Sequence, residues 1–411
     1  MAITIKQEGT GIRPVYNDDF IVVTSDKYLQ YGFQYVADLF VNGVLKTRLK
    51  TFPHPTNTAG MFNVKRIVES YVTKDIDLTT TDFATNDNSW CTYQLSFGEE
   101  YGSATSGTTI YSGITSGTLH YCFNGIVDYE SYTNFDTTER VLTSNTKKFL
   151  TNKPTSINIG SSEKEYLYGI SSTSGDCYYA AIATYDSAGT ILGVYYNTNP
   201  YQAITTDAMK FFRLAVGTAD LAGGAWVASV PYSLPIISAS VAYYKVHMVK
   251  YNGTQTSIDQ TYVITDQCTK TSTTRLFFMN KLGGYDAFTF KHKQKHGVDI
   301  TRSNFKKPQG VWSVIGGNIS FLYGNTDRAI TQYDTSLKDT ITIVSDWITE
   351  AESDWLEELL TSPDVYVEKS GVNVPINIVA SSYERKQQAT AKTINITLEY
   401  TYSYNRYRQR A

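Results

Sequence analysis

The sequence has few charged residues, few cysteines and no paired cysteine motif. Lys, Arg, Asp and Glu make up 18% of the 411 residues, against about 25% in an average soluble protein. The net charge of −3 argues against a nucleic-acid-binding surface that extends over the whole protein. The four cysteines (Cys91, Cys122, Cys177 and Cys268) form no CxxC pair, so structural zinc is not expected. The alternative to four free thiols is a single disulfide between Cys91 and Cys122, which would need an oxidising compartment.

A signal peptide and a membrane span are also missing. Residues 1–8 contain no charged segment followed by an apolar one, as a secretory signal requires. The most apolar stretch, residues 214–244, is interrupted by Asp220, Gly223, Gly224, Pro231 and Pro235. A transmembrane helix needs about 20 mostly apolar residues. We therefore expect a soluble protein that does not insert into a membrane.

Tyrosine is abundant, with 33 copies in a chain that is 14% aromatic. Its ring is apolar and its hydroxyl is polar, so it suits half-buried strands and wet interfaces. Stretches of Ser, Thr, Asn and Gly are typical of turns, and the length exceeds what one hydrophobic core usually serves. These features predict a mostly β protein with a multidomain β-sandwich or β-barrel-like architecture and one or two short helices.

Changes in pattern along the chain predict three parts. Residues 1–135 form an N-terminal β domain, and residues 136–250 form an inserted or second β-sandwich module of short strands and polar turns. Residues 251–411 form a C-terminal β-rich domain. No repeat of 20–50 residues is visible, so a solenoid or propeller is not expected.

A β-hairpin is the clearest local prediction. Residues 28–41 alternate so that Phe33, Tyr35 and neighbours at period two share one face. Asn42-Gly43 follows, which is a type I′ turn signal, and residues 44–49 return as the partner strand. Further along, Asn63 is placed to cap a short helix over residues 64–71. A Ser/Gly/Thr-rich loop is expected between strands near 90–98 and 119–129.

One longer helix is predicted at residues 349–361. Thr349 and Glu352 form a capping box, and Ser362-Pro363 ends the helix. Its apolar stripe begins at Trp355 and ends at Leu360. The strand that follows near the C-terminus alternates Ile394, Ile396, Leu398, Tyr400 and Tyr402 on one face.

Catalytic and cofactor motifs are missing. There is no P-loop, GxSxG or HExxH motif, and no GxGxxG after a strand. His292 and His296 have a spacing that suits zinc on a helix, but the three lysines among them would repel a cation, so a solvated basic turn is the expected structure. The acidic pairs Asp18-Asp19 and Glu99-Glu100 are poor glycosidase candidates, because that chemistry needs two carboxylates about 5–10 Å apart across a sugar. We expect no enzyme, no cofactor and no metal.

Two clusters of basic residues are candidate contact sites. The first is a candidate basic patch that would meet an acidic neighbour, a phosphate or an anionic glycan; an ordinary charged face is the alternative. Its members are Lys291, Lys293, Lys295, Arg302, Lys306 and Lys307. The second cluster alternates with tyrosines at the C-terminus. It would either contact another subunit or form a solvated tail. Its members are Arg406, Arg408 and Arg410.

Adjacent tyrosines form the remaining signal. On a strand, one member of each pair faces each side of the sheet. The inner member is then core, and the outer member is free to stack on a sugar ring or to pack against a partner protein. The pairs are Tyr178-Tyr179, Tyr195-Tyr196 and Tyr243-Tyr244.

Three segments together resemble virion structural proteins of tailed bacteriophages, especially phages of Bacteroidetes-type hosts. One runs from Tyr31 to Val64, with YGFQYVADLFVNG, FPHP and GMFNV. Another is RLFFMNKLGGYDAFTF from Arg275, and the third runs from Ser345 through the predicted helix to residue 367. The segments lie in the outer two parts, and residues 136–250 match nothing in that group.

The resemblance implies a tail, tail-tip or baseplate component that is present in several copies in a ring, with other virion proteins as neighbours. Tyr285 and Phe288, beside Gly283-Gly284, are then expected to be core or interface anchors, and the C-terminal arginines to be contacts between subunits. The virion would be assembled in the host cytoplasm. The alternative is a carbohydrate-binding or host-attachment β module that contacts a host glycan through outward aromatic residues.

Overall fold

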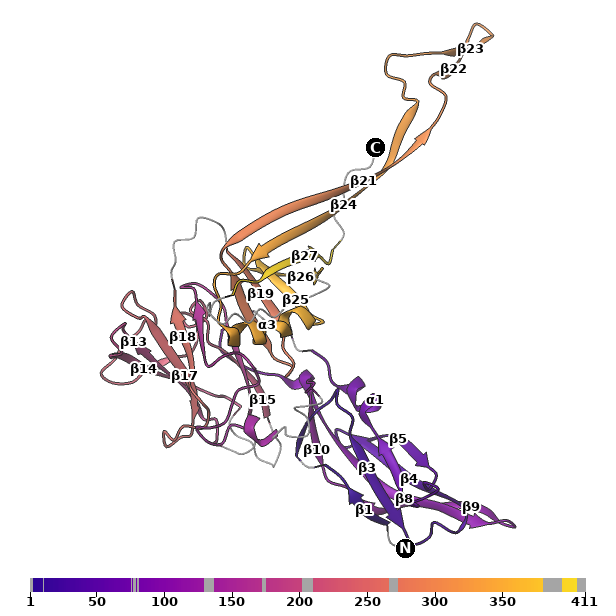
Figure 1. Ribbon diagram of the computed structural model, residues 1–411, viewed down its shortest axis with the longest axis vertical. Helices are drawn as coiled ribbons and strands as arrows, with labels where there is room; N and C mark the ends of the chain where they lie inside the picture. The colour runs from indigo at the N-terminus through magenta and orange to yellow at the C-terminus, as the bar shows by residue number, and fades with distance from the viewer. Residues whose placement is uncertain are drawn as a thin grey trace. The chain divides into compact units, whose positions relative to one another are not determined.

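The computed structural model describes residues 3–9, 11–74, 76, 79, 81–128, 137–171, 175–201, 210–265, 273–379 and 394–404. Strands account for 52% of the structure and helices for 7%. The mostly β, multidomain fold class with short helices is therefore confirmed. Figure 1 shows the elements in chain order.

The chain forms two compact units. Unit 1 consists of Met1–Cys268 and Phe278–Ala287, and unit 2 consists of Thr269–Phe277 and Phe288–Ala411. The division at residues 135 and 250 stays a prediction. Two sheets contain strands from both sides of these positions, because residues 83–85 pair with 212–214 and residues 156–159 pair with 261–264.

The first half of unit 1 is a sandwich of two sheets around one core. The smaller sheet has the order β1 (Ile3–Gln7), β3 (Phe20–Ser25), β6 (Gly60–Asn63). The larger sheet has the order β2 (Ile12–Pro14), β10 (His120–Phe123), β8 (Trp90–Ser103), β4 (Tyr31–Val41), β5 (Val44–Thr51), with β9 (Gly107–Ser116) also paired to β8. The core between them includes Val23, Tyr35 and Leu95, each fully buried.

The predicted hairpin and short helix are present. β4 and β5 pair around Asn42 and Gly43, whose φ angles of 50° and 74° are those of a type I′ turn. The helix is shorter than expected, with α1 over Lys65–Val68 followed by a 3₁₀ turn, η1, over Glu69–Tyr71. The prediction of a loop between residues 98 and 119 is wrong. The segment is largely strand β9, which pairs with β8 from Ser96–Ser116 to Ser103–Gly107 and is rich in the strand-forming residues Thr, Ile and Tyr.

The second half of unit 1 is another pair of sheets. One has the order β11 (Ser156–Ile159), β18 (Gln260–Ile264), β17 (Tyr243–Val249), β13 (Tyr179–Tyr185), β14 (Ile191–Thr198), β16 (Val227–Ala228). The other has the order β12 (Tyr166–Ser171), β15 (Lys210–Ala215), β7 (Phe83–Thr85). Two 3₁₀ turns, η2 (Asp87–Ser89) and η3 (Thr137–Arg140), also lie in unit 1. The core holds Ile182, Leu214 and Tyr244, all fully buried.

Unit 2 contains most of a seven-stranded sheet. Its order is β20 (Tyr285–Phe290), β19 (Thr274–Met279), β25 (Val365–Lys369), β26 (Val372–Ile378), β27 (Thr397–Tyr402), β24 (Ile330–Val344), β21 (Lys293–Lys306). In β27 the alternation is as predicted, because Leu398 and Tyr400 are 0% and 1% exposed. The helix α3 spans Glu350–Thr361, and Thr349 and Glu352 form the predicted capping box.

A long two-stranded ribbon extends from this sheet. β21 and β24 pair from Lys293–Val344 to Lys306–Ile330, which makes a ribbon roughly 45 Å long. Beyond it, β22 (Val311–Ile315) and β23 (Asn318–Leu322) form a second small hairpin at the tip. Figure 1 shows the ribbon leading to this tip. We call residues 291–345 the arm. The prediction of a solvated turn around His292 and His296 is wrong, because residues 293–306 form one continuous strand.

The cysteines described by the structure are all free thiols in the core: Cys91, Cys122 and Cys177. Cys91 and Cys122 lie directly opposite each other on β8 and β10. The two residues named for a disulfide are therefore cross-strand neighbours, but they are not bonded.

Candidate functional site

The two expected anchor residues have different surroundings. Tyr285 is 0% exposed and belongs to the core. Phe288 is half-buried, and its ring lies 6.1 Å from that of Trp355 on α3 and 5.2 Å from that of Phe290. Both residues therefore hold the fold together in this chain, and their role between subunits stays a prediction. Arg406, Arg408 and Arg410 lie outside the described residues.

The predicted basic patch is spread along the arm. Lys293, Lys295 and Arg302 are exposed on β21, and Lys293 and Arg302 are about 30 Å apart along the strand. These two residues are also an odd number of positions apart, so their side chains point to opposite faces of the strand. Lys306 and Lys307 are exposed near the far end of β21, and Lys291 precedes the strand. The arm thus carries scattered positive charge, and the lysines and arginine do not form one compact patch.

The acidic pairs considered for glycoside hydrolysis do not face a shared space. Glu99 is fully buried and accepts a hydrogen bond from Ser25. Its neighbour Glu100 pairs with Lys50 at 2.5 Å on the other face of β8, and the hydrogen bond from Lys50 lowers the pKa of that carboxyl. Asp19 is paired with Arg13. Within the described part of the chain, no three His, Cys, Asp or Glu side chains are grouped as metal ligands.

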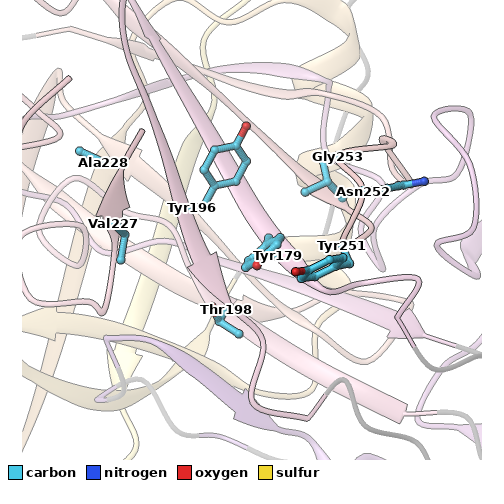
Figure 2. Close-up of a pocket in the computed structure, with 9 residues that line it drawn as sticks. Tyr179, Tyr196, Thr198, Val227, Ala228, Tyr251, Asn252 and Gly253 are labelled. Carbon is cyan, nitrogen blue, oxygen red and sulfur yellow. The ribbon is translucent and has the colours of Figure 1, made fainter. Parts of the chain in front are cut away.

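A groove lined by tyrosines lies on the outer face of the sheet that contains β13 and β14. Its volume is about 560 Å³. The lining residues come from β13, β14, β16, the end of β17 and the turn that follows (Figure 2). They are Tyr179, Tyr196, Thr198, Val227, Ala228, Val249, Tyr251, Asn252 and Gly253. None of them is charged, so the groove is suited to a neutral ligand.

Strand alternation explains how these side chains reach one face. Tyr179 pairs with Thr198 and with Val249 on the neighbouring strands, and directly paired residues share a face. Tyr196 lies two residues before Thr198 and therefore points the same way. Its neighbour Tyr195 points into the core and is 4% exposed.

The adjacent-tyrosine prediction is confirmed for two of the three pairs. Tyr195 and Tyr244 are buried, and Tyr196 and Tyr243 face outward. The third pair differs because β13 begins at Tyr179, so Tyr178 is not held to strand alternation. The rings of that pair instead lie edge to face with centroids 4.5 Å apart, and both are half-buried.

Tyr179 and Tyr251 form the floor of the groove, and Tyr196 forms a wall beside it. The rings of Tyr179 and Tyr251 have centroids 6.4 Å apart and planes only 25° from parallel. Figure 2 shows them side by side, with Tyr196 above. The Tyr196 ring is tilted by 63° to the Tyr179 ring, at 5.9 Å. A flat ligand on the floor would therefore meet a second ring at its edge.

The arm is the second candidate surface. Twelve of its large apolar or aromatic side chains are more than a third exposed. They are Val298, Ile300, Phe305, Val311, Trp312, Val314, Ile315, Ile319, Leu322, Tyr323, Ile330 and Tyr333. Val314 and Ile315 are neighbours, so they point to opposite faces, and each is 68% exposed. Apolar groups are thus exposed on both faces of the tip.

Sequence reasoning missed the arm. The signal was present in residues 311–322, where two strand-forming runs flank Gly316-Gly317. These glycines have φ angles of 58° and 85°, which a two-residue hairpin turn requires.

Comparisons with known proteins identify no relative. A scan against protein-family models finds no match, and a search of curated proteins finds none either. Among the described residues, no helix is long and apolar enough to cross a membrane.

Proposed function

We propose that this protein is an assembly subunit, a structural component of a tailed-bacteriophage virion, and that the arm binds a neighbouring copy of the same chain. The observation that carries the proposal is the exposed apolar surface of the arm. The resemblance of the outer segments to tail, tail-tip and baseplate proteins supports the same role, with several copies arranged in a ring.

The arm has a physical reason to need a partner. An isolated two-stranded hairpin is marginally stable in water, because it has no third strand or opposing sheet to cover its apolar groups. Trp312 and Ile319 on the tip hairpin are 71% and 73% exposed. Apolar patches of this kind are typical of interaction sites. Burying a side chain such as Ile319 contributes about 1.5–3 kcal/mol.

Charge favours a second copy as the partner. Residues 291–345 contain eight Lys and Arg against four Asp and Glu, a net charge of +4. The whole chain carries −3, so the rest of the chain carries −7. A positive arm is therefore attracted to the negative remainder of another copy. An arm that docks on a different surface of its neighbour makes a heterologous contact, and such contacts form rings when the rotation closes.

The test is the mass of the full-length protein by light scattering, together with electron micrographs of the same sample. We expect oligomers and closed rings for the natural sequence. The triple variant Trp312→Ser, Ile315→Ser, Ile319→Ser should reduce the association constant about a hundredfold or more, because it removes apolar contact area at the tip.

Val44 and Leu45 provide the matched control. They are 55% and 51% exposed at the β4–β5 hairpin of unit 1, so they are also apolar residues at a hairpin end. The variant Val44→Ser, Leu45→Ser should leave the oligomer mass unchanged. A natural sequence that stays monomeric at working concentration would contradict the proposal, and so would equal dissociation of the two variants.

A further inference from the structure

We propose that the tyrosine groove of unit 1 is a binding site for a neutral carbohydrate, with a pyranose ring stacked on Tyr179 and Tyr251. This binding does not depend on the arm, which belongs to unit 2, so it goes beyond the assembly role. The inference rests on the shape of the groove, on its uncharged lining and on the construction of the turn that carries Tyr251.

The shape of the groove matches one face of a sugar. A pyranose ring has a flat face of C–H groups and an edge of hydroxyls. The C–H groups carry partial positive charge, and the face of an aromatic ring is negative, so the two attract when they stack. Tyr179 and Tyr251 present two rings side by side, with planes only 25° from parallel, as a surface for such stacking.

The polar groups at the groove suit sugar hydroxyls. Three tyrosine hydroxyls and Thr198 supply groups that both donate and accept hydrogen bonds. A tyrosine hydroxyl is protonated at neutral pH and can donate, and burial raises the pKa of Tyr179 further above its ordinary value. Small-molecule sites typically combine aromatic walls with a few polar groups of this kind.

The position of Tyr251 is set by a tight turn. Gly253 has a φ of 83° and donates its N–H to the carbonyl of Lys250 at 2.9 Å. The Asn252 side chain accepts from the N–H of Thr254 at 3.1 Å, and Lys250 N–H donates to the Thr254 carbonyl. The turn therefore holds the Tyr251 backbone, and the Tyr251 ring packs edge to face against Tyr178, with centroids 5.0 Å apart, although the residue is 73% exposed. A prearranged ring loses little conformational entropy on binding.

Another outward pair on the same sheet has a different arrangement. Tyr185 and Tyr243 stack face to face, with centroids 4.8 Å apart and planes 5° from parallel, and Lys245 lies over the Tyr185 ring. Each ring of this pair has a face covered by the other, and neither lines the groove. Tyr243 is therefore a matched control for groove tyrosines.

The experiment uses the full-length protein on an array of neutral oligosaccharides built from glucose, galactose, mannose and N-acetylhexosamines. A heparin hexasaccharide serves as the anionic probe and a decaproline peptide as the protein-like probe. Calorimetry then gives the Kd of the best neutral binder. We expect Tyr179→Ala and Tyr251→Ala each to raise that Kd about tenfold or more, as loss of a stacking ring does. Tyr251→Trp should retain binding, and Tyr243→Ala should leave the Kd within about twofold.

Three results would overturn the proposal. The first is no binding of any neutral member at about 5 mM. The second is binding of heparin or decaproline in place of the neutral sugars. The third is an equal effect of Tyr243→Ala and Tyr251→Ala. Because arm variants should still bind the sugar, failure of the assembly proposal and failure of this one are separate outcomes.

Discussion

Lys153 and Glu165 form a fully buried ion pair in unit 1, with Nζ 2.5 Å from Oε1 and both side chains 0% exposed. The ammonium group also lies 3.4 Å from Oδ1 of Asp286, and Oδ2 of the same carboxylate accepts a hydrogen bond from the Thr151 hydroxyl. Two carboxylates around one ammonium group compensate for its loss of water. Because the carboxylates of Glu165 and Asp286 are both buried, the cluster is a structural element of the core.

Removal of the ammonium group should destabilise the fold. Lys153→Met removes the ammonium group that lies between the buried carboxylates of Glu165 and Asp286, and breaking a buried ion pair in this way costs about 3–5 kcal/mol. The measurement is the free energy of unfolding in urea. Lys148→Met is the control, because the Lys148–Glu139 pair is half-exposed and worth about 0–1 kcal/mol. Equal costs for the two variants would show that the buried cluster adds nothing.

The contribution of this cluster should depend on alkaline pH. Burial alone lowers the pKa of Lys153, but attraction by Glu165 and Asp286 overcomes it and raises the pKa above 10.5. A raised folded-state pKa means that the contribution is complete below pH 10.5 and declines as the pH rises through the folded-state value. The difference in unfolding free energy between the natural sequence and Lys153→Met should therefore shrink from pH 8 to about pH 11.5. A constant difference would be evidence against the assignment.

The core thiols should resist alkylation. Burial raises the pKa of Cys91 and of Cys177 to about 12, and it also raises that of Cys122. At pH 8 the thiolate fraction of Cys91 is then about a thousandfold smaller than at the ordinary pKa of 9.0. Iodoacetamide labelling followed by peptide mass spectrometry should show these three sites unmodified in the folded protein and modified in guanidinium chloride. Rapid labelling of the folded protein would mean that the strands open.

The capping box of α3 should be measurable by itself. Thr349 accepts from the Glu352 N–H at 3.2 Å, and the Glu352 side chain accepts from the Thr349 N–H at 2.8 Å. Thr349→Ala removes the first bond and should cost about 1 kcal/mol in urea unfolding. Thr361→Ala, at the other end of the same helix, should change the unfolding free energy by less than about 0.5 kcal/mol.

Local elements were predictable where the signal lies within a few residues. Asn42-Gly43 specifies its turn because both residues tolerate positive φ, and Thr349 specifies a helix start because its hydroxyl reaches the N–H three residues on. The arm was missed although Gly316-Gly317 marks its tip. Its strands are exposed on both faces, so they lack the alternation of buried and exposed residues by which most strands are recognised.

The sequence by itself determined the β-rich class, the turns and the capped helix, because those depend on backbone preferences and on neighbours within one turn. Tertiary structure decided which tyrosines meet. Tyr179 and Tyr251 share a floor only because β13 pairs with β17 and the turn after β17 brings Tyr251 back beside it. Tertiary structure also decided that Lys153 contacts Asp286, which lies in a distant segment of the chain. Such contacts depend on the register and order of strands far apart in the chain, which no local pattern encodes.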